Sequence, residues 1–260
     1  MSFVGRPLAI VLALLGPAAA ASAEEQSTVN VYAGSASVSD GYEDRDYIGA
    51  YLAVFGDGVG FHADVSSVSR EEDATFGAVG VSWDATESLR PQLMVGTSSD
   101  NFNILPEVFA SAQLRYKPAG AEGWVITPRL TYRSYRSGGE EVQPAIDVVR
   151  YLPPADASGY WVLQGGAALS LNSSDENGYS VSGGVQTVRA NGLTAGLAGE
   201  AGKMTYDSLL GIGVESDFWA LRPSLGYRIT PKHEIYLRGE IAETDFYDVQ
   251  GLLLGLKLGL

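Results

Sequence analysis

Alternation of apolar residues with small or polar ones is the feature that most constrains the fold of this chain. The C-terminal stretch reads VQGLLLGLKLGL, with leucine at every even position from 252 to 260 and glycine or lysine at positions 251, 255, 257 and 259. A period of two is that of a β-strand, whose successive side chains point to opposite faces. In a helix these leucines would be scattered around the axis, and each glycine would cost about 1 kcal/mol relative to alanine. The stretch is therefore predicted to be a strand with one apolar face.

The same rhythm recurs along the chain in about 14 segments. They lie near residues 28–39, 45–55, 59–69, 74–83, 88–98, 107–117, 124–135, 142–152, 160–171, 179–189, 193–203, 217–229, 234–243 and 249–260. Bacterial outer-membrane barrels have an even number of strands, each of about ten residues and tilted across the hydrocarbon region. The predicted fold is all-β, a single closed antiparallel transmembrane β-barrel. Because the boundaries carry an error of a few residues, 12 strands is the alternative count.

The connections between these segments fall into two alternating sets. One set is short and rich in glycine and proline, at residues 56–58, 84–87, 118–123, 153–159, 190–192 and 230–233, and is typical of periplasmic turns. The other set is more acidic and is predicted to form the outer loops, at residues 40–44, 70–73, 98–106, 137–141, 172–178, 204–216 and 244–248. Strict alternation of the two sets predicts that both termini lie in the periplasm.

Aromatic residues gather near the segment ends. They include Tyr47, Tyr51, Phe55, Trp83, Tyr116, Trp124, Tyr132, Tyr160, Trp161, Phe218, Trp219 and Tyr227. Two girdles at the membrane interfaces would produce this distribution. The alternative is the ordinary preference of strands for aromatic residues.

The N-terminus has the pattern of a secretory signal. Arg6 is followed by an apolar run from Leu8 to Leu15, and the small residues Ala21 and Ala23 precede Glu24. This pattern predicts a cleaved signal peptide over residues 1–23 and a barrel over residues 24–260. Without Arg6, 16 of the 17 basic residues remain against 31 acidic ones, so nucleic acid is not an expected partner.

Two further absences in the sequence narrow the fold and the chemistry. The chain has no cysteine, which excludes disulfides and thiolate metal sites. After the signal no run of about 18 apolar residues occurs, so no transmembrane helix is predicted.

Two stretches of the chain resemble the YaiO family of outer-membrane β-barrel proteins of Gram-negative bacteria. They are PRLTYRSYRSGGEEVQPAIDVVRY at 128–151 and LGYRITPKHEIYLRGEIAETDFYDVQGLLLG at 225–255. The resemblance implies an integral barrel of the cell envelope with no established activity, no catalytic residue and no cofactor to carry over. The helical repeat region that precedes the barrel in polysaccharide exporters is absent, which weakens an export function.

The C-terminal segment Val249–Leu260 resembles the assembly signal of outer-membrane proteins, which implies recognition by the outer-membrane assembly machinery. Such signals usually end in an aromatic residue, whereas this chain ends in Leu260.

Several charged residues fall on the parity predicted to face the lumen. They are Arg115, Arg129, Arg133, Arg222, Arg228, Arg238, Glu240 and Lys257. In a water-filled lumen such a basic ladder would select anions or carboxylated sugars by its field and by bidentate hydrogen bonding. The alternative is a network of ion pairs that fills and stiffens the barrel.

His62 and Asp64 share the lumen parity of one segment. In a hydrolase, His62 could act as a general base that Asp64 orients, with Ser66 or Ser98 as the nucleophile. Because nothing in the sequence fixes these residues together, we expect a hydrogen-bonded pair in the lumen instead, and the protein is not expected to be an enzyme. His233 is predicted to be a solvated turn residue.

The acidic loops suggest contact with the cell surface. DGYED at 40–44 and DENG at 175–178 could bind divalent cations together with lipopolysaccharide, but neither has the spacing of a calcium loop, so no metal site is predicted. The expected partners are outer-membrane lipid and lipopolysaccharide, and the short loops favour a monomer.

The leading functional hypothesis is a passive channel for small hydrophilic or anionic solutes, because a barrel of this size is wider than the eight-stranded kind whose interior is filled. The connections 98–106 and 204–216 could fold inward as partial constrictions. A second hypothesis is a non-conducting structural or surface-interaction barrel linked to envelope integrity or surface polysaccharide. A third, a lipid-modifying enzyme, would need His62 near a serine at the membrane boundary.

Overall fold

The computed structural model describes residues 27–69, 73–99, 105–136, 138–153, 158–173, 177–207 and 213–260. The predicted signal peptide, residues 1–23, lies outside this described part. Within it the elements are all β-strands. No helix long and apolar enough to cross a membrane occurs among the described residues.

Fourteen strands follow one another along the chain. They are β1 (Thr28–Val38), β2 (Arg45–Gly56), β3 (Val59–Ser69), β4 (Ala74–Trp83), β5 (Leu89–Ser98), β6 (Val108–Tyr116), β7 (Trp124–Ser134), β8 (Glu140–Leu152), β9 (Gly159–Asn172), β10 (Asn177–Arg189), β11 (Leu193–Asp207), β12 (Gly213–Thr230), β13 (His233–Thr244) and β14 (Asp248–Gly259).

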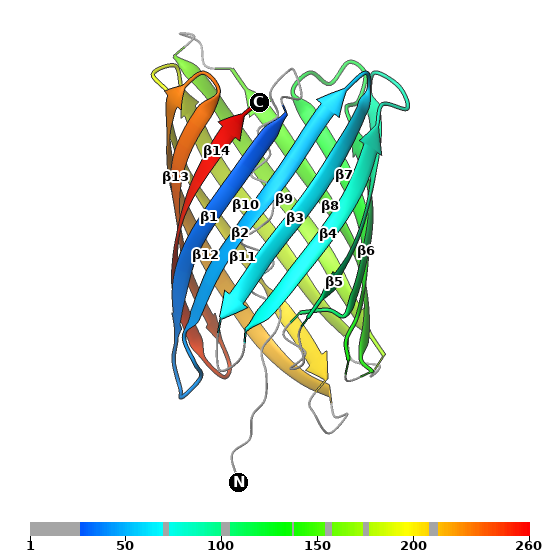
Figure 1. The fold of residues 1–260 in the computed structure, drawn as a ribbon, viewed down its shortest axis with the longest axis vertical. Helices are drawn as coiled ribbons and strands as arrows, with labels where there is room; N and C mark the ends of the chain where they lie inside the picture. Colours follow the sequence, from blue (N-terminus) through cyan, green and yellow to red (C-terminus); the bar gives the residue numbers. More distant parts are fainter. Residues whose placement is uncertain are drawn as a thin grey trace.

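Each strand pairs antiparallel with its neighbours in sequence, and β1 pairs with β14 to close the barrel (Figure 1). The closing register runs from Thr28 opposite Gly259 to Val38 opposite Val249. Closure leaves no free sheet edge. A sheet in lipid must have none, because no water is present there to hydrogen-bond to unpaired backbone groups. The predicted fold and the count of 14 strands are therefore confirmed, and the alternative of 12 strands is wrong.

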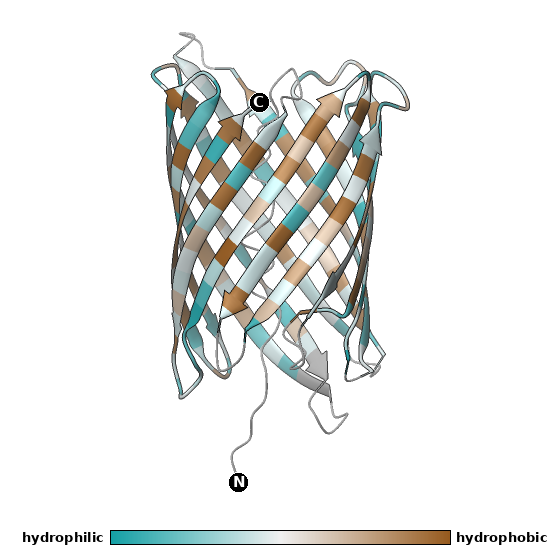
Figure 2. Cartoon of the chain, viewed as in Figure 1, coloured by the Kyte–Doolittle hydropathy of each residue, from teal (hydrophilic) through white to brown (hydrophobic). Residues whose placement is uncertain are grey.

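The apolar face of the sheet is the outer one. On β14, Leu252 and Leu254 are 55% and 54% exposed on the outside, whereas Leu253, on the other parity, is 4% exposed. The same alternation gives each strand of the barrel its bands of apolar and polar residues (Figure 2). A soluble protein would bury these leucines, whereas a membrane barrel presents them to lipid tails.

Connections of the two predicted kinds lie at opposite ends of the barrel. The end that holds the tight turns 57–58, 190–192 and 231–232, together with the C-terminus, is called the turn end, and the other the loop end (Figure 1). The turn after β2 is Asp57-Gly58, with φ of 49° and 76°, the left-handed geometry that a two-residue hairpin favours. The start of β1 and the end of β14 both lie at the turn end.

The predicted outer loop at 204–216 is largely strand. β11 continues to Asp207 and β12 begins at Gly213, with Met204 opposite Ser216 in an unbroken ladder. β11 and β12 are the longest strands, with 15 and 18 residues. Where a strand runs beyond the lipid, polar outward residues such as Thr205 and Glu215 do not interrupt the ladder. The prediction that this stretch folds inward as a constriction was wrong for its strand residues; part of the other predicted constriction, 98–106, lies outside the described residues.

The aromatic residues divide between the two faces. Those on the outer face are Trp83, Tyr116, Trp124, Trp161 and Tyr227 near the turn end and Tyr132 and Trp219 near the loop end. Five others that had been assigned to girdles lie on the inner face instead: Tyr47, Tyr51, Phe55, Tyr160 and Phe218. The physical reason is parity, because each of these five shares the side of its strand with buried or polar residues.

Candidate channel lumen

The inner face of the barrel has two unlike walls. On β1 to β4 it carries large side chains, among them Tyr32, Tyr51, His62 and Phe76. On β9 to β11 the inner parity is mostly small: Gly166, Ala168, Ser170, Ser180, Ser182, Gly184, Gly196 and Ala198. Because β10 is seven strands from β3 around the closed order, the small wall faces the bulky one. The small side chains reach least far into the lumen.

Arg222 is the centre of an ion cluster on the inner wall. Its Nε donates to Glu240 Oε1 at 2.9 Å, and its Nη1 donates to Glu200 Oε2 at 2.9 Å. These contacts join β11, β12 and β13, and Glu240 is 2% exposed. Arg222 and Glu240 were singled out from the sequence, whereas Glu200 was not.

The two predicted arginines of β7 also have acidic partners. Arg133 Nη1 donates to Glu141 Oε2 at 2.8 Å, and Glu141 accepts a second hydrogen bond from Ser170 at 2.6 Å. Arg129 lies 3.8 Å from Asp147. Sequence reasoning missed these carboxylates, although the parity of β8 places both on the lumen side. Three cations of the predicted basic ladder, Arg129, Arg133 and Arg222, are thus paired with carboxylates within the wall.

His62 belongs to a hydrogen-bonded group different from the predicted one. Its Nδ1 is 2.7 Å from the Tyr51 hydroxyl and its Nε2 is 2.9 Å from Ser82 Oγ. The Nε of Arg90 donates to the same Ser82 oxygen at 3.3 Å. Both ring nitrogens are therefore engaged, and the serine beside His62 is the fully buried Ser82 rather than Ser66 or Ser98.

Asp64 does not pair with His62. Its Oδ1 is buried and accepts no hydrogen bond within the described part of the chain. The expected His62–Asp64 pair was therefore wrong, because neighbours on β2 and β4 lie closer to the ring than a residue two positions along β3. The arrangement has hydrogen bonds suited to stiffening the wall.

Basic residues gather inside the turn end. Arg90 and Arg115 are opposite each other in the β5–β6 register, and Lys117 follows β6 on the same parity. Arg90 is held by Asp84 at 3.2 Å and by the Phe55 ring, whose centroid lies 4.9 Å from the guanidinium carbon. Lys117 lies outside the membrane-spanning strands. Its pKa is lowered, mainly because the group is partly buried and secondly because of the nearby positive charge of Arg115.

The remaining predicted lumen charges lie on β12 to β14. Arg228 and Lys257 each lie opposite Glu234 in their registers, near the turn end. Arg238 lies nearer the middle, with its guanidinium carbon 4.8 Å from the ring centroid of Tyr236. Around the turn end the described inner charges are thus mainly basic, with Asp84 and Glu234 as the acidic ones.

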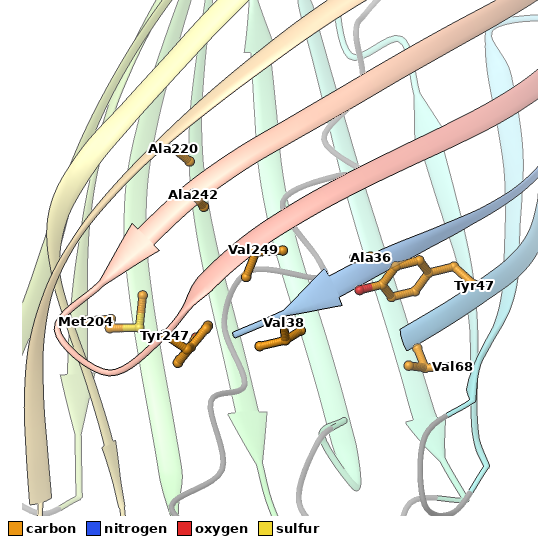
Figure 3. Packing of buried hydrophobic residues seen from close by; sticks show 9 residues of the cluster. All are labelled: Ala36, Val38, Tyr47, Val68, Met204, Ala220, Ala242, Tyr247 and Val249. Atoms are coloured by element: carbon orange, nitrogen blue, oxygen red, sulfur yellow. The ribbon is translucent and has the colours of Figure 1, made fainter. Parts of the chain in front are cut away.

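An apolar cluster lines the inner face at the loop end. It comprises Ala36, Val38, Tyr47, Val68, Met204, Ala220, Ala242, Tyr247 and Val249 (Figure 3). Arg45 lies opposite Ala36 in the register, is 1% exposed, and has Nε and Nη2 without hydrogen-bond partners in the described part. The parity of β2 would have identified Arg45 as a lumen residue.

Comparison with known proteins supports the fold and nothing finer. No family model and no curated protein matches the chain. Among solved structures, it is similar to a bacterial polysaccharide outer membrane secretin, with a TM-score of 0.58 and 5% identity over 90% of this chain and 98% of that one.

It is also similar to the Acinetobacter baumannii outer membrane protein Omp33, with a TM-score of 0.53 and 9% identity over 90% of this chain and 99% of that one. The chain therefore has the fold of an outer-membrane β-barrel protein.

Proposed function

We propose that this barrel is a passive outer-membrane channel for small hydrophilic solutes, with a preference for anions created at the turn end. The observation that carries the proposal is the arrangement of the lumen ion pairs. Each described ion pair involving Arg129, Arg133 or Arg222 joins adjacent strands of the wall. Charges paired in this way line the lumen, whereas side chains that close a barrel by themselves must meet across it.

Barrel width supports the same proposal. Eight strands give an interior that side chains fill, and about 16 to 18 strands leave an aqueous channel. Fourteen strands lie between these cases, so the reach of the side chains decides whether water fills the lumen. The small inner residues of β9 to β11, such as Ser182 and Ala198, favour a water-filled lumen along that wall.

The expected selectivity follows from the number of basic residues that lie together inside the turn end. Arg129, Arg133 and Arg222 have nearby carboxylates and contribute little net field. Arg90, Arg115 and Lys117 lie close together near Asp84, and a low-dielectric wall focuses the field of such a cluster into the lumen. Anions are therefore expected to permeate more readily than cations of the same size.

Swelling of liposomes that contain the refolded protein tests this proposal. We expect influx of both a neutral pentose and glucuronate, and an Arg115→Gln/Lys117→Gln double variant should slow glucuronate severalfold while leaving the pentose unchanged. Lys203→Gln, which removes a cation from an outer-wall pair with Glu215, is the matched control and should behave as the unaltered protein. Absence of swelling with either solute would overturn the proposal.

A non-conducting surface barrel is the second candidate, favoured by the apolar cluster at the loop end. Val38, Tyr247 and Val249 pack together there, and Arg45 is also buried at that end. Inward side chains of this size would narrow the lumen at the loop end. The similarity to a bacterial polysaccharide outer membrane secretin suggests surface polysaccharide as the partner of such a barrel. Correctly folded protein that admits neither solute would make this candidate the leading one.

The orientation and partners in the cell belong to the same proposal. The turn end is assigned to the periplasm with both termini, the loop end to the cell surface beside lipopolysaccharide, and Val249–Leu260 to recognition by the assembly machinery. The protein is proposed to act as a monomer without a cofactor.

A further inference from the structure

The outer wall at the turn end carries four side chains on four adjacent strands. Trp124 of β7, Arg150 of β8, Trp161 of β9 and Arg189 of β10 all have the outward parity of their strands. Trp124 lies opposite Arg150 in the register. Arg150 and Arg189 each lie two residues from the position opposite Trp161. Aromatic and cationic side chains thus alternate across these four strands, and we call this set of residues the tryptophan–arginine strip.

Each arginine of the strip stacks on a tryptophan. The guanidinium carbon of Arg150 is 4.9 Å from the ring centroid of Trp124, and that of Arg189 is 5.9 Å from the centroid of Trp161. Stacking restrains the guanidinium plane through a cation–π contact and leaves its edge N–H groups available. In the part of the chain that the structure describes, neither arginine forms a salt bridge with a carboxylate.

The depth of the tryptophan–arginine strip in the bilayer determines which part of the lipid it contacts. An outward arginine costs about 2–4 kcal/mol at the bilayer midplane but about 0–1 kcal/mol near the interface, where tryptophan is also enriched. Arg150 lies two residues before the end of β8, and Arg189 is the last residue of β10. The strip therefore lies at the level of the lipid headgroups, where the anionic group is phosphate.

The outer wall at the loop end has the opposite character. Lys203 is neutralised by Glu215 at 2.7 Å, Trp219 Nε1 donates to Glu243 at 3.0 Å, and the Tyr132 hydroxyl donates to Glu140. The interfacial aromatic residues there are thus accompanied by carboxylates, which repel anionic headgroups. Only the turn end combines interfacial tryptophan with outward cations in the described strands β7 to β10.

We propose that the tryptophan–arginine strip is a binding site for anionic phospholipid in the leaflet at the turn end. The guanidinium edges of Arg150 and Arg189 donate to the headgroup phosphate, and Trp124 and Trp161 hold those guanidinium groups at the headgroup level. Arginine suits this task because its planar donors match two phosphate oxygens at once. The site lies on the outer wall, so it does not depend on whether the lumen conducts.

Spin-label electron paramagnetic resonance on the refolded protein in phosphatidylcholine bilayers tests the site. Trace spin-labelled phosphatidylglycerol and spin-labelled phosphatidylcholine would be compared for their motionally restricted fraction at the protein surface. We expect phosphatidylglycerol to be preferred about fivefold at low salt, since each interfacial cation attracts anionic lipid. The preference should fall as salt screens the charges.

An Arg150→Gln/Arg189→Gln variant should lose the preference while phosphatidylcholine contact stays unchanged. Lys203→Gln, the cation of the loop-end wall, should leave the preference intact. Heat-modifiable mobility on a gel would show that each variant is folded, and Arg150→Lys/Arg189→Lys serves as a milder variant that keeps the charge. Equal restriction of both lipids by the unaltered protein, or an unchanged preference in the glutamine variant, would overturn the proposal.

Discussion

Arg222 is held more tightly than the other charged residues described on the inner wall, since it donates to carboxylates on both neighbouring strands. Glu200 and Glu240 would repel each other without it, and Glu240 is almost fully buried. The cluster therefore acts as one unit that ties β11, β12 and β13 together. Removing its single cation is expected to cost more than removing either anion.

Replacing Arg222 by glutamine should lower the free energy of unfolding by about 2–4 kcal/mol, because breaking a buried ion cluster leaves uncompensated charge. Arg136→Gln is the matched control, since Arg136 lies 3.8 Å from Glu107 in an exposed pair, and should cost under about 1 kcal/mol. Equilibrium unfolding in denaturant, with the protein refolded into lipid, gives both values. Equal losses for the two variants would show that the cluster has no special role.

Parity predicted which residues face the lumen but not which residues they contact. Arg129, Arg133, Arg222 and Lys257 were placed on the inner face from the alternation alone. Their partners lie on other strands, so naming them requires the register between strands. His62 is the clearest failure, because Asp64 was the nearest acid along its own strand while Tyr51 and Ser82 approach from β2 and β4.

Tyrosine rings laid over glycines join the strands around the closure of the barrel. Tyr236 of β13 packs over Gly255 of β14 and donates to Asn30 of β1 at 2.9 Å. Tyr32 of β1 packs in the same way over Gly49 of β2. The missing side chain of each glycine makes room for the ring, so one tyrosine can link strands that are not neighbours.

A methyl group at Gly255 should displace the Tyr236 ring and break its hydrogen bond to Asn30. We expect Gly255→Ala to destabilise the barrel by about 1–3 kcal/mol, the usual cost of overpacking. Gly165→Ala is the control, because a Cβ there makes only an ordinary contact, and it should be neutral or stabilising by under about 1 kcal/mol. Unfolding midpoints of the two variants measure the difference, and a harmless Gly255→Ala would contradict the tyrosine link.

Strand positions were predictable because alternation persists wherever one face meets lipid. The predicted boundaries of β3 and β4, 59–69 and 74–83, agree with the structure, whereas β11 and β12 run further than expected. Beyond the lipid, the outward residues of a strand need not be apolar, so the alternation that reveals a strand disappears there. The ladder from Met204 opposite Ser216 onward carries no such sequence signal.

The two ends of the barrel differ in the sign of their charged residues. Inner and outer cations gather at the turn end, where Arg90, Arg115, Arg150 and Arg189 lie, while the described charged residues of the loop end are mainly acidic. This polarity follows from two independent sets of residues on the two faces of the wall. A channel built in this way would present acid to one opening and base to the other.

Closure and strand number followed from the sequence, but the width of the free lumen did not. Width depends on how far side chains such as Tyr51, Phe76 and Ser182 reach toward one another from strands far apart in the sequence. Strand periodicity specifies only the face of each residue. The contrast between the bulky wall of β1 to β4 and the small wall of β9 to β11 emerged only when the strand order placed them opposite each other.

Single-channel conductance of the refolded protein in a planar bilayer tests whether the lumen is open. An open lumen with a basic turn end predicts steady conductance steps that favour anions, with a smaller step in Ser182→Arg, which adds a large side chain to the small wall. Heat-modifiable mobility would first show that both proteins are folded. Folded protein that leaves the bilayer silent would contradict an open lumen and identify the barrel as a closed one.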